Sequence, residues 1–369
     1  MKKKLILADS DEMYLTNLSN FFMEKAPQFE LNLFTRADKL YEYLKTGAKA
    51  DILAVSEDMA GAELLELADG MAAIVLSATM NPVEGYGLVR KYQKTQALLN
   101  EILLLYAESS NSVEAIRGQS NTRIAAFYSP AGGTGKTTLA LALATAAAWE
   151  GKKVFYLNLE EIDSVSEVLG TTPGTLSDIF LALKTKGMNV GLKLAGCTGT
   201  EQQAGFSYLS GTESISEFDE IGAEDMRKLV TALRGLSEYD LAVVDLASGF
   251  SAKTQAVLEE MDVIFVPMLP EEGAVSKMKR LVKEQEIHEQ YAPILSKMRM
   301  VMNRSGVTEM ARAIQGSGLA DQIPCCGAVA QFPVLARYSD ILRSGGALGQ
   351  VMAPLLRETE QEQDGGMPV

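Results

Sequence analysis

The sequence predicts an α/β protein made of two doubly wound, parallel-sheet domains. Short apolar runs alternate with amphipathic stretches over residues 1–118, and strand-like apolar runs recur between residues 124 and 356. Buried strands that alternate with helices indicate a parallel sheet covered by helices. The 369 residues are enough for two domains of ordinary size.

The N-terminal domain, residues 1–118, contains five predicted strands. They are the apolar runs Leu5–Ala8, Leu31–Phe34, Ile52–Val55, Ala73–Leu76 and Ile102–Leu105. The stretches Met13–Lys25 and Ala37–Lys45 are predicted helices. The polar stretch Glu108–Arg123 follows, and we expect its residues 119–123 to form an interdomain linker.

Composition narrows the classes of function. Lysine and arginine number 34 against 48 aspartates and glutamates, which gives a formal net charge of −14. This charge disfavours nonspecific nucleic-acid binding and attraction to anionic membranes, because both depend on an excess of cations. Residues 357–369 are acidic and lack apolar periodicity, so we expect a disordered tail rather than a basic membrane-binding helix.

Two further absences in the sequence bear on compartment and chemistry. The three cysteines lack metal-ligand spacing, and the single histidine, His288, rules out a histidine cluster or a histidine-dependent triad. No signal peptide or bilayer-spanning apolar run is recognisable. We therefore expect a cytoplasmic protein without a membrane anchor.

The most informative motif is a glycine-rich loop between the apolar run Ile124–Tyr128 and the predicted helix Leu139–Trp149. A strand, a glycine loop and a helix in this order are typical of a phosphate-binding loop, whose backbone N–H groups bind the anion. The candidate nucleotide-binding residues of this loop are Ala131, Gly132, Gly133, Thr134, Gly135, Lys136, Thr137 and Thr138. We expect Lys136 to reach the β- and γ-phosphates and the Thr137 hydroxyl to ligate Mg²⁺.

The loop departs from the common pattern G-x-x-x-x-G-K-[ST] because Pro130 stands in place of the first glycine. The adjacent Gly132 and Gly133 resemble the variant loop of the ParA/MinD family of dimeric ATPases. In that family a lysine before the paired glycines reaches the nucleotide of the partner subunit. Here that position is Ala131. The resemblance implies phosphate binding in cis without the cation supplied in trans.

Further motifs resemble the same family, in the same order, between residues 122 and 356. Tyr239–Asp245 resembles the Walker B strand, which implies that Asp245 holds Mg²⁺ through water. Glu160 stands where the family has an aspartate that positions the attacking water. The resemblance thus makes Lys136, Glu160 and Asp245 the catalytic candidates, and Thr137 and Asp245 the metal ligands.

The base-binding candidates also come from this resemblance. Asn303 resembles the asparagine that recognises adenine, and its amide offers both a donor and an acceptor. ATP with Mg²⁺ is therefore the expected cofactor. Arg304, Pro267, Phe332 and Pro333 complete the predicted nucleotide-binding set. Arg304 and Lys253 remain open as substitutes for the missing trans cation.

The N-terminal domain is similar in its order of elements to the receiver domain of two-component response regulators. Its site residues differ from the receiver pattern, because Asp9 is followed by Ser10, and Ser56 replaces the phospho-accepting aspartate. A serine hydroxyl is a poor phosphoryl acceptor without an activating base. The switch threonine is replaced by Ser77.

The receiver lysine is expected directly after the fifth strand. If that strand is Ile102–Leu105, the position holds Tyr106 or Ala107, and the charge is missing. We interpret the domain as a pseudo-receiver used for docking or dimerisation. A working receiver that uses Asp58 is the alternative.

A receiver-like domain joined to a ParA/MinD-type domain resembles the TadZ/CpaE group, spatial organisers of Tad/Flp pilus secretion machinery at a cell pole. The resemblance implies an ATP-binding homodimer with weak or absent hydrolysis. Its receiver-like domain would contact the pilus machinery or other polar proteins.

Two alternative functions stay open on the sequence alone. One is an active ParA/MinD-type ATPase that positions DNA or another cargo, and the acidic charge counts against it. The other is an NtrC-type transcription regulator, for which no helix-turn-helix candidate follows the ATPase-like domain.

Overall fold

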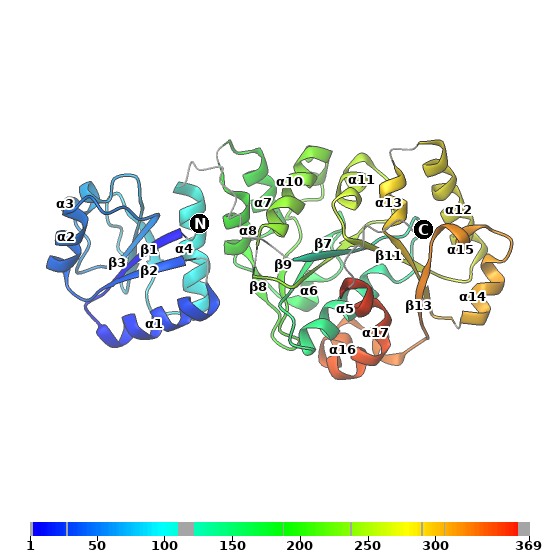
Figure 1. Ribbon diagram of the computed structural model, residues 1–369. Helices are drawn as coiled ribbons and strands as arrows, with labels where there is room; N and C mark the ends of the chain where they lie inside the picture. Colours follow the sequence, from blue (N-terminus) through cyan, green and yellow to red (C-terminus); the bar gives the residue numbers. More distant parts are fainter. Residues whose placement is uncertain are drawn as a thin grey trace, which may run out of the picture. The chain divides into compact units, whose positions relative to one another are not determined.

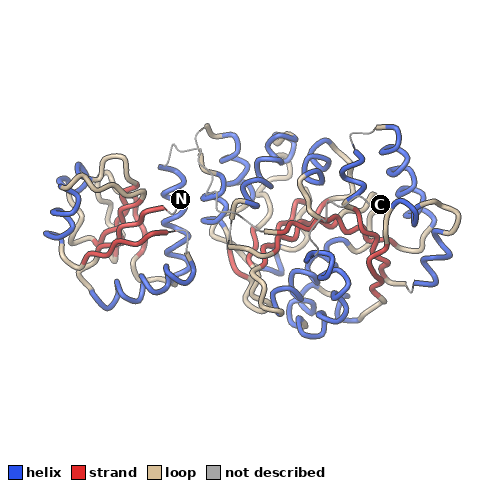
Figure 2. The backbone as a smooth tube through the Cα atoms, viewed as in Figure 1, coloured by secondary structure: helices blue, strands red, loops and turns tan. Residues whose placement is uncertain are grey.

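The computed structural model describes residues 3–26, 29–109, 122–186, 188–236, 238–288, 291–305 and 307–360. The chain forms two compact units (Figures 1 and 2). The N-terminal unit comprises residues 1–118 together with residues 185–197, and the nucleotide-binding unit comprises residues 119–184 and 198–369.

The N-terminal unit is built on a parallel sheet with the strand order β2-β1-β3-β4-β5. The strands are β1 Lys3–Ala8, β2 Phe29–Phe34, β3 Ile52–Ser56, β4 Ala72–Ser77 and β5 Gly87–Arg90. The helices are α1 Glu12–Lys25, α2 Ala37–Lys45, α3 Ala62–Leu67 and α4 Thr95–Ser109. Alternate residues of β1 enter separate cores, Leu5 and Leu7 on one face and Ile6 and Ala8 on the other.

One predicted strand is wrong. Ile102–Leu105 lies inside α4, and β5 is the fifth strand of the sheet instead. Leu98, Leu99, Ile102 and Leu103 are buried at helical spacing. This part of the chain is apolar over most of its length, so periodicity alone does not distinguish a buried helix from a buried strand.

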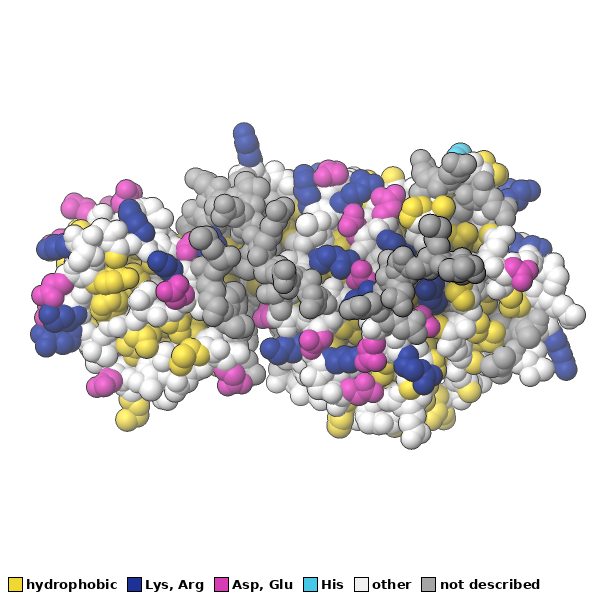
Figure 3. Space-filling view, viewed as in Figure 1, with side chains coloured by type: hydrophobic (Ala, Val, Ile, Leu, Met, Phe, Trp, Pro, Cys, Tyr) yellow, Lys and Arg dark blue, Asp and Glu magenta, His cyan; other side chains and the backbone are white. Residues whose placement is uncertain are grey.

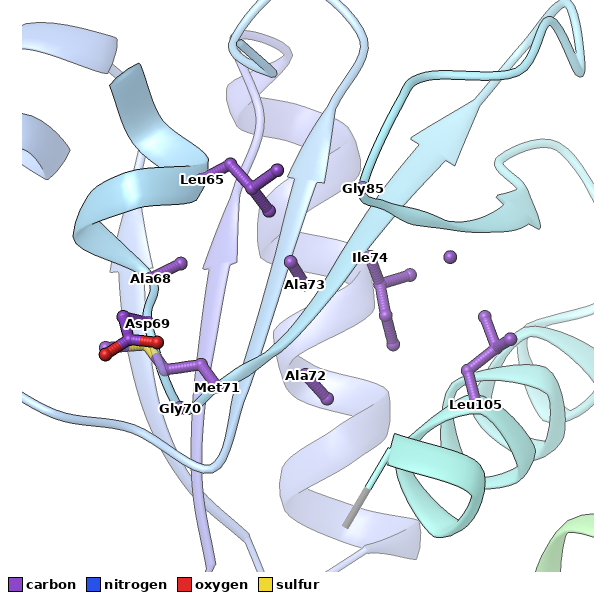
Figure 4. A pocket seen from close by; sticks show the side chains of 11 residues that line it. Leu65, Ala68, Asp69, Gly70, Met71, Ala72, Ala73, Ile74, Gly85 and Leu105 are labelled. Atoms are coloured by element: carbon purple, nitrogen blue, oxygen red, sulfur yellow. The ribbon is translucent and has the colours of Figure 1, made fainter. Parts of the chain in front are cut away.

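The connection between β4 and β5, residues 78–86, is fully described and contains no helix. A cavity of about 550 Å³ lies beside this edge of the sheet. Leu65 of α3 and Leu105 of α4 border it on either side of β4, as Figure 4 shows. Gly85 has a left-handed φ of +81°, and a Cβ atom there would lie 2.2 Å from Leu65 Cδ2. Glycine is therefore needed where the chain passes this wall.

Helix α8, Val190–Cys197, belongs to the N-terminal unit although it lies within the nucleotide-binding part of the sequence. Its Leu192 is buried in the core beneath α4, and Asn189 Oδ1 accepts a hydrogen bond from the Leu192 N–H at the start of the helix. A Cβ atom on Gly196 would lie 2.6 Å from Leu104 Cγ. The two helices therefore approach closely only because residue 196 has no side chain.

Replacement of Leu192 by alanine tests whether α8 is part of the N-terminal core. We expect Leu192→Ala to lower the free energy of unfolding of this unit by about 2–5 kcal/mol, because it leaves a cavity under α4. Hydrogen exchange of β1 and β3 in the full chain measures the change. Leu181→Ala is the matched control, since Leu181 is 69% exposed. Equal exchange in both variants would contradict the assignment.

The nucleotide-binding unit contains an eight-stranded sheet with the order β13-β12-β11-β6-β10-β7-β9-β8. All neighbouring strands are parallel except β8 and β9. The strands are β6 Arg123–Phe127, β7 Val154–Leu159, β8 Gly199–Thr200, β9 Ser207–Leu209, β10 Leu241–Leu246, β11 Val263–Met268, β12 Met298–Asn303 and β13 Cys325–Val329.

The helices of this unit follow in chain order. They are α5 Lys136–Trp149, α6 Ser166–Leu169, α7 Leu176–Lys184, α9 Glu217–Glu220, α10 Ala223–Arg234, α11 Ala252–Glu259, α12 Glu272–Ile287, α13 Ala292–Ser296, α14 Val307–Ile314, α15 Leu319–Gln322, the 3₁₀ helix η2 Pro333–Ala336, α16 Tyr338–Arg343 and α17 Gly345–Glu360. Helix α5 is buried over most of its surface and packs against α16 and α17, which are drawn in red tones beside it in Figure 1.

The predicted linker and tail both need correction at one end. Thr122 is buried, its hydroxyl donates to two backbone carbonyls, and Arg123 already belongs to β6. At the other end, residues 357–360 continue α17 rather than being disordered. Glu358 pairs with Arg299 at 3.1 Å, and Thr359 is buried, so these residues are anchored by packing and charge. Residues 119–121 and 361–369 lie outside the described residues.

Candidate functional site

The glycine-rich loop lies between β6 and α5, at the carboxyl end of a central strand, where open parallel sheets bind ligands. Gly133 and Gly135 have left-handed φ angles of 72° and 93°. A Cβ atom on Gly135 would lie 2.3 Å from Asn303 Nδ2. Position 135 therefore accepts glycine without strain and no residue with a side chain.

The other loop residues complete a compact turn at the start of α5. Ala131 and Thr134 are buried, and the Thr134 hydroxyl donates to the Ala131 carbonyl at 3.4 Å. Gly132 and Gly133 are exposed, so their backbone is open to a ligand. Thr137 and the half-buried Thr138 lie in the first turn of α5, where backbone N–H groups have no partner within the helix. The predicted loop residues thus lie together as one potential anion cradle.

Lys136 does not extend freely into solvent. It is 7% exposed, and its Nζ donates to Ser248 Oγ at 2.7 Å. Ser248 Oγ in turn donates to the Ala131 carbonyl at 3.2 Å. Ser248 was not among the site residues predicted from the sequence, because its contact with Lys136 joins residues far apart in the chain.

Asp245 lies at the end of β10 and is fully buried. The Tyr156 hydroxyl donates to Asp245 Oδ2 at 3.2 Å. Among the described residues, no hydrogen-bond partner is found for Asp245 Oδ1. Burial, and next the negative charge of Glu160, raise the pKa of Asp245 to about 7, against the opposing influence of Thr137, Lys136 and Tyr156.

The residues around Asp245 fit a bound Mg²⁺. A buried carboxylate oxygen without a partner is costly unless a cation or donor satisfies it. The Thr137 hydroxyl is the second protein oxygen of this corner. Among the described residues, no cluster of three or more His, Cys, Asp or Glu side chains could hold a metal.

Glu160 follows β7 and contributes charge to the same corner. Its N–H donates to Asn158 Oδ1 at 2.9 Å, and its Oε2 accepts from the Ser164 hydroxyl at 3.1 Å. Asn158 Nδ2 also donates to Asp163 Oδ1 at 3.0 Å. The carboxylate is thus close enough to affect Asp245 electrostatically, while its role in water positioning stays a prediction.

Asn303, the predicted adenine reader, contacts the loop directly. Its Nδ2 donates to the Thr134 carbonyl at 2.7 Å, and its Oδ1 accepts from the Arg304 N–H at 3.0 Å. The amide therefore connects the end of β12 with the phosphate loop. Arg304 is exposed and has an unusual left-handed φ of 53° for a residue with a Cβ atom. Adenine recognition by Asn303 stays a prediction.

The remaining predicted base-binding residues lie on separate elements. Pro267 is buried within β11. The pairing between β11 and β6 ends at Phe265, so no hydrogen bond of that ladder is lost because proline has no N–H. Phe332 is half-buried and precedes η2, whose first residue, Pro333, is exposed. A role of these three residues in base binding stays a prediction.

The raised pKa of Asp245 predicts a specific pH dependence of stability. The folded form of an acid with a raised pKa holds its proton longer, so stability falls as pH rises from about 4 to about 7. We expect Asp245→Asn to unfold at higher denaturant concentration than the wild type at pH 8, with the difference shrinking towards pH 4. Urea titrations of the nucleotide-free protein across this range measure it.

Asp163→Asn is the control of opposite sign. Burial raises the pKa of Asp163, but hydrogen bonds from Ser166, the Val165 N–H and Asn158 together lower it below its usual value. The ionised Asp163 carboxylate therefore stabilises the folded protein at neutral pH, and this stabilisation is lost in acid. Asp163→Asn should thus destabilise the protein at pH 8. A destabilised Asp245→Asn at pH 8 would contradict the account of Asp245.

The N-terminal unit has a second polar cluster at the carboxyl end of its sheet. Lys91 directly follows β5, and its Nζ lies 2.7 Å from Asp9 Oδ2 and 2.9 Å from Asp9 Oδ1. Asp9 is fully buried and Lys91 is 9% exposed. The prediction that the receiver lysine is missing was wrong, because it rested on the mistaken strand Ile102–Leu105.

The carboxylates of Glu57 and Asp58 interact with polar groups at the carboxyl end of the same sheet. Glu57 Oε1 accepts from the Ser77 hydroxyl, from the Thr79 hydroxyl at 2.7 Å and from the Thr79 N–H at 3.3 Å. The nearby Ser56 hydroxyl lowers the pKa of Asp58 from its usual value, and Ser10 also contributes to this shift. Use of Asp58 as a phospho-acceptor stays an untested alternative.

Replacing Lys91 by methionine tests the buried ion pair. We expect Lys91→Met to cost about 3–5 kcal/mol of stability in the N-terminal unit, because the Asp9 charge is left buried and uncompensated. The double variant Asp9→Asn/Lys91→Met should recover most of that loss. Hydrogen exchange of β1 is the measurement.

Lys45→Met is the control for that experiment. The pair between Lys45 and Glu63 is exposed, so its loss should cost less than about 1 kcal/mol. A cost for Lys91→Met no larger than that of Lys45→Met would contradict the assignment of a buried pair.

Comparison with known proteins agrees with both units. Residues 125–333 match the CobQ/CobB/MinD/ParA nucleotide binding domain, and the chain belongs to this family. Residues 1–107 match the TadZ-like receiver domain. The predicted α/β class and the receiver-plus-ParA/MinD architecture are thereby confirmed.

Solved structures share the fold at low sequence identity. A ParA family ATPase from Chlorobium tepidum TLS has a TM-score of 0.51 and 18% identity, and the match covers 66% of this chain and 99% of that one. The septum site-determining protein MinD from Pyrococcus horikoshii OT3, complexed with Mg-ADP, has a TM-score of 0.50 and 17% identity, with 65% and 96% covered.

A relative in Methanocaldococcus jannaschii, described as an ATP-binding protein, is 26% identical over 160 residues. The match covers 42% of this chain and 56% of that protein, so it spans little more than half of the relative. Within the described part of the chain, no helix is both long enough and apolar enough to cross a lipid bilayer.

Proposed function

We propose that this protein binds Mg²⁺-ATP, dimerises through the nucleotide-bound units and organises Tad/Flp pilus-type secretion machinery at a cell pole, with slow or absent ATP hydrolysis. The observation that carries the proposal is the phosphate loop, which has left-handed glycines and Lys136 at the helix start but Ala131 in place of the trans lysine. Such a loop retains the groups that bind phosphate and lacks a group that accelerates its transfer.

The chain's own residues account for binding. Backbone N–H groups of the loop and the first turn of α5 would hold the phosphates, and Lys136 would add an ammonium group to the cradle. Thr137 and Asp245 would hold Mg²⁺, which neutralises phosphate charge when it is bound. Asn303 would recognise adenine from its position beside Thr134.

Dimerisation follows from mass action on this bound state. A nucleotide that contacts both facing subunits stabilises the symmetric dimer whether or not it is hydrolysed. The absence of a trans cation at Ala131 makes transfer of the γ-phosphate slow, so that the dimer would persist. A long-lived dimer suits a protein that marks a location rather than one that cycles between monomer and dimer.

The receiver-like unit is the proposed contact with pilus machinery or other polar proteins. Support comes from its match to the TadZ-like receiver domain and from the engagement of Lys91 and Ser77 by Asp9 and Glu57 within the unit. A scaffold that presents one constant surface to its partners does not need to be phosphorylated. On the face shown in Figure 3, the basic and acidic side chains of the described residues are interspersed.

Restoring the missing cation tests the proposed loss of turnover. We expect wild-type protein to bind Mg²⁺-ATP with little phosphate release, and Ala131→Lys to release phosphate at least about 100-fold faster. Ala131→Met is the control, because it has nearly the same length without the charge. Ordinary ATPase turnover by the wild type, or Ala131→Lys no faster than Ala131→Met, would contradict the proposal.

Light scattering with and without Mg²⁺-ATP tests dimerisation, and Lys136→Ala should remain monomeric in both conditions. A fluorescent fusion in a bacterium with Tad-type pili tests the location. Diffuse fluorescence at native expression level would count against the polar role.

A further inference from the structure

Ser248 lies in the connection between β10 and α11 and joins two parts of the phosphate loop. Its hydroxyl has one proton, which it donates to the Ala131 carbonyl at 3.2 Å. The oxygen lone pairs therefore face a donor, and Lys136 Nζ supplies it at 2.7 Å. The hydroxyl is satisfied in both directions only while Lys136 stays in this position.

We propose that Ser248 is a positioning residue that holds Lys136 beside the phosphate loop until a nucleotide binds, and that nucleotide binding replaces Ser248 by phosphate oxygen as the partner of Lys136. This inference rests on the proposed ATP binding. Lys136 is 7% exposed, so its ammonium needs a polar partner inside the protein when no phosphate is present. Ser248 supplies that partner from the connection between β10 and α11.

The exchange has a consequence for affinity. Phosphate must first displace Ser248 from Lys136, so this contact stabilises the nucleotide-free state and opposes binding. Loss of the hydroxyl should therefore tighten Mg²⁺-ATP binding rather than weaken it. An ordinary structural serine would have the opposite effect or none.

The exchange of partners at Lys136 also affects the connection between β10 and α11, which carries Ser248. Three residues further on, Ser251 Oγ accepts from the Thr254 N–H and caps α11. Between them, the Phe250 ring contacts Tyr128 and Tyr291. When Lys136 is released, the hydrogen bond from Ser248 to the Ala131 carbonyl still joins this connection to the loop.

The first experiment uses no nucleotide. The full-length wild type, Ser248→Ala, Ser248→Thr and Ser251→Ala are treated briefly with acetic anhydride, and acylation of Lys136 is measured by peptide mass spectrometry. We expect Lys136 to react about fivefold faster in Ser248→Ala, because its ammonium is released to solvent. Ser248→Thr retains the hydroxyl, and Ser251→Ala loses one elsewhere in the same connection, so both should match the wild type.

The second experiment measures Mg²⁺-ATP affinity of the same four proteins by calorimetry. We expect Ser248→Ala to bind about fivefold more tightly than the other three. An unchanged acylation rate, or an affinity equal to or weaker than wild type, would overturn the role of Ser248. Absence of Mg²⁺-ATP binding in all four proteins would overturn the proposed function, whereas the acylation rates test the Ser248 contact by itself.

Discussion

The nucleotide site depends on the absence of a side chain at Gly135. The chain turns there with a left-handed φ of 93°, and Asn303 Nδ2 occupies the space that a Cβ atom would need. This close approach lets Asn303 hold the Thr134 carbonyl, so the end of β12 fixes the loop from which α5 begins. The position of Lys136 at the first turn of α5, and with it the contact to Ser248, follows from that turn.

Much of the fold and of the loop could be predicted because their causes are local. Apolar runs of strand length, separated by amphipathic stretches, require a covered parallel sheet in almost any arrangement. The helix Ala37–Lys45 was predicted with the bounds it has, since its two buried leucines, Leu40 and Leu44, recur at helical spacing. Glycines before Lys136 indicate a loop by their conformational freedom alone.

The rest depends on contacts between residues far apart in the chain. Ile102–Leu105 is apolar throughout, so its sequence fits a buried strand as well as a buried helix. In the structure β5 takes the place of the fifth strand, and this run lies within α4. The error hid Lys91, which pairs with an aspartate 82 positions away. Leu192 enters the N-terminal core from the other part of the sequence, and Ser248 meets Lys136 across 112 positions. The periodicity of apolar residues along the chain does not indicate which distant residues pair.

The nucleotide carried by freshly purified protein shows whether the loop captures ATP without cleaving it. The protein is denatured in acid, and the released nucleotides are identified and counted by chromatography. We expect ATP rather than ADP, in amounts comparable to the protein, and we expect the bound ATP to be lost in Lys136→Ala. Protein that carries no nucleotide and fails to take up ATP at millimolar concentration with Mg²⁺ would contradict this expectation.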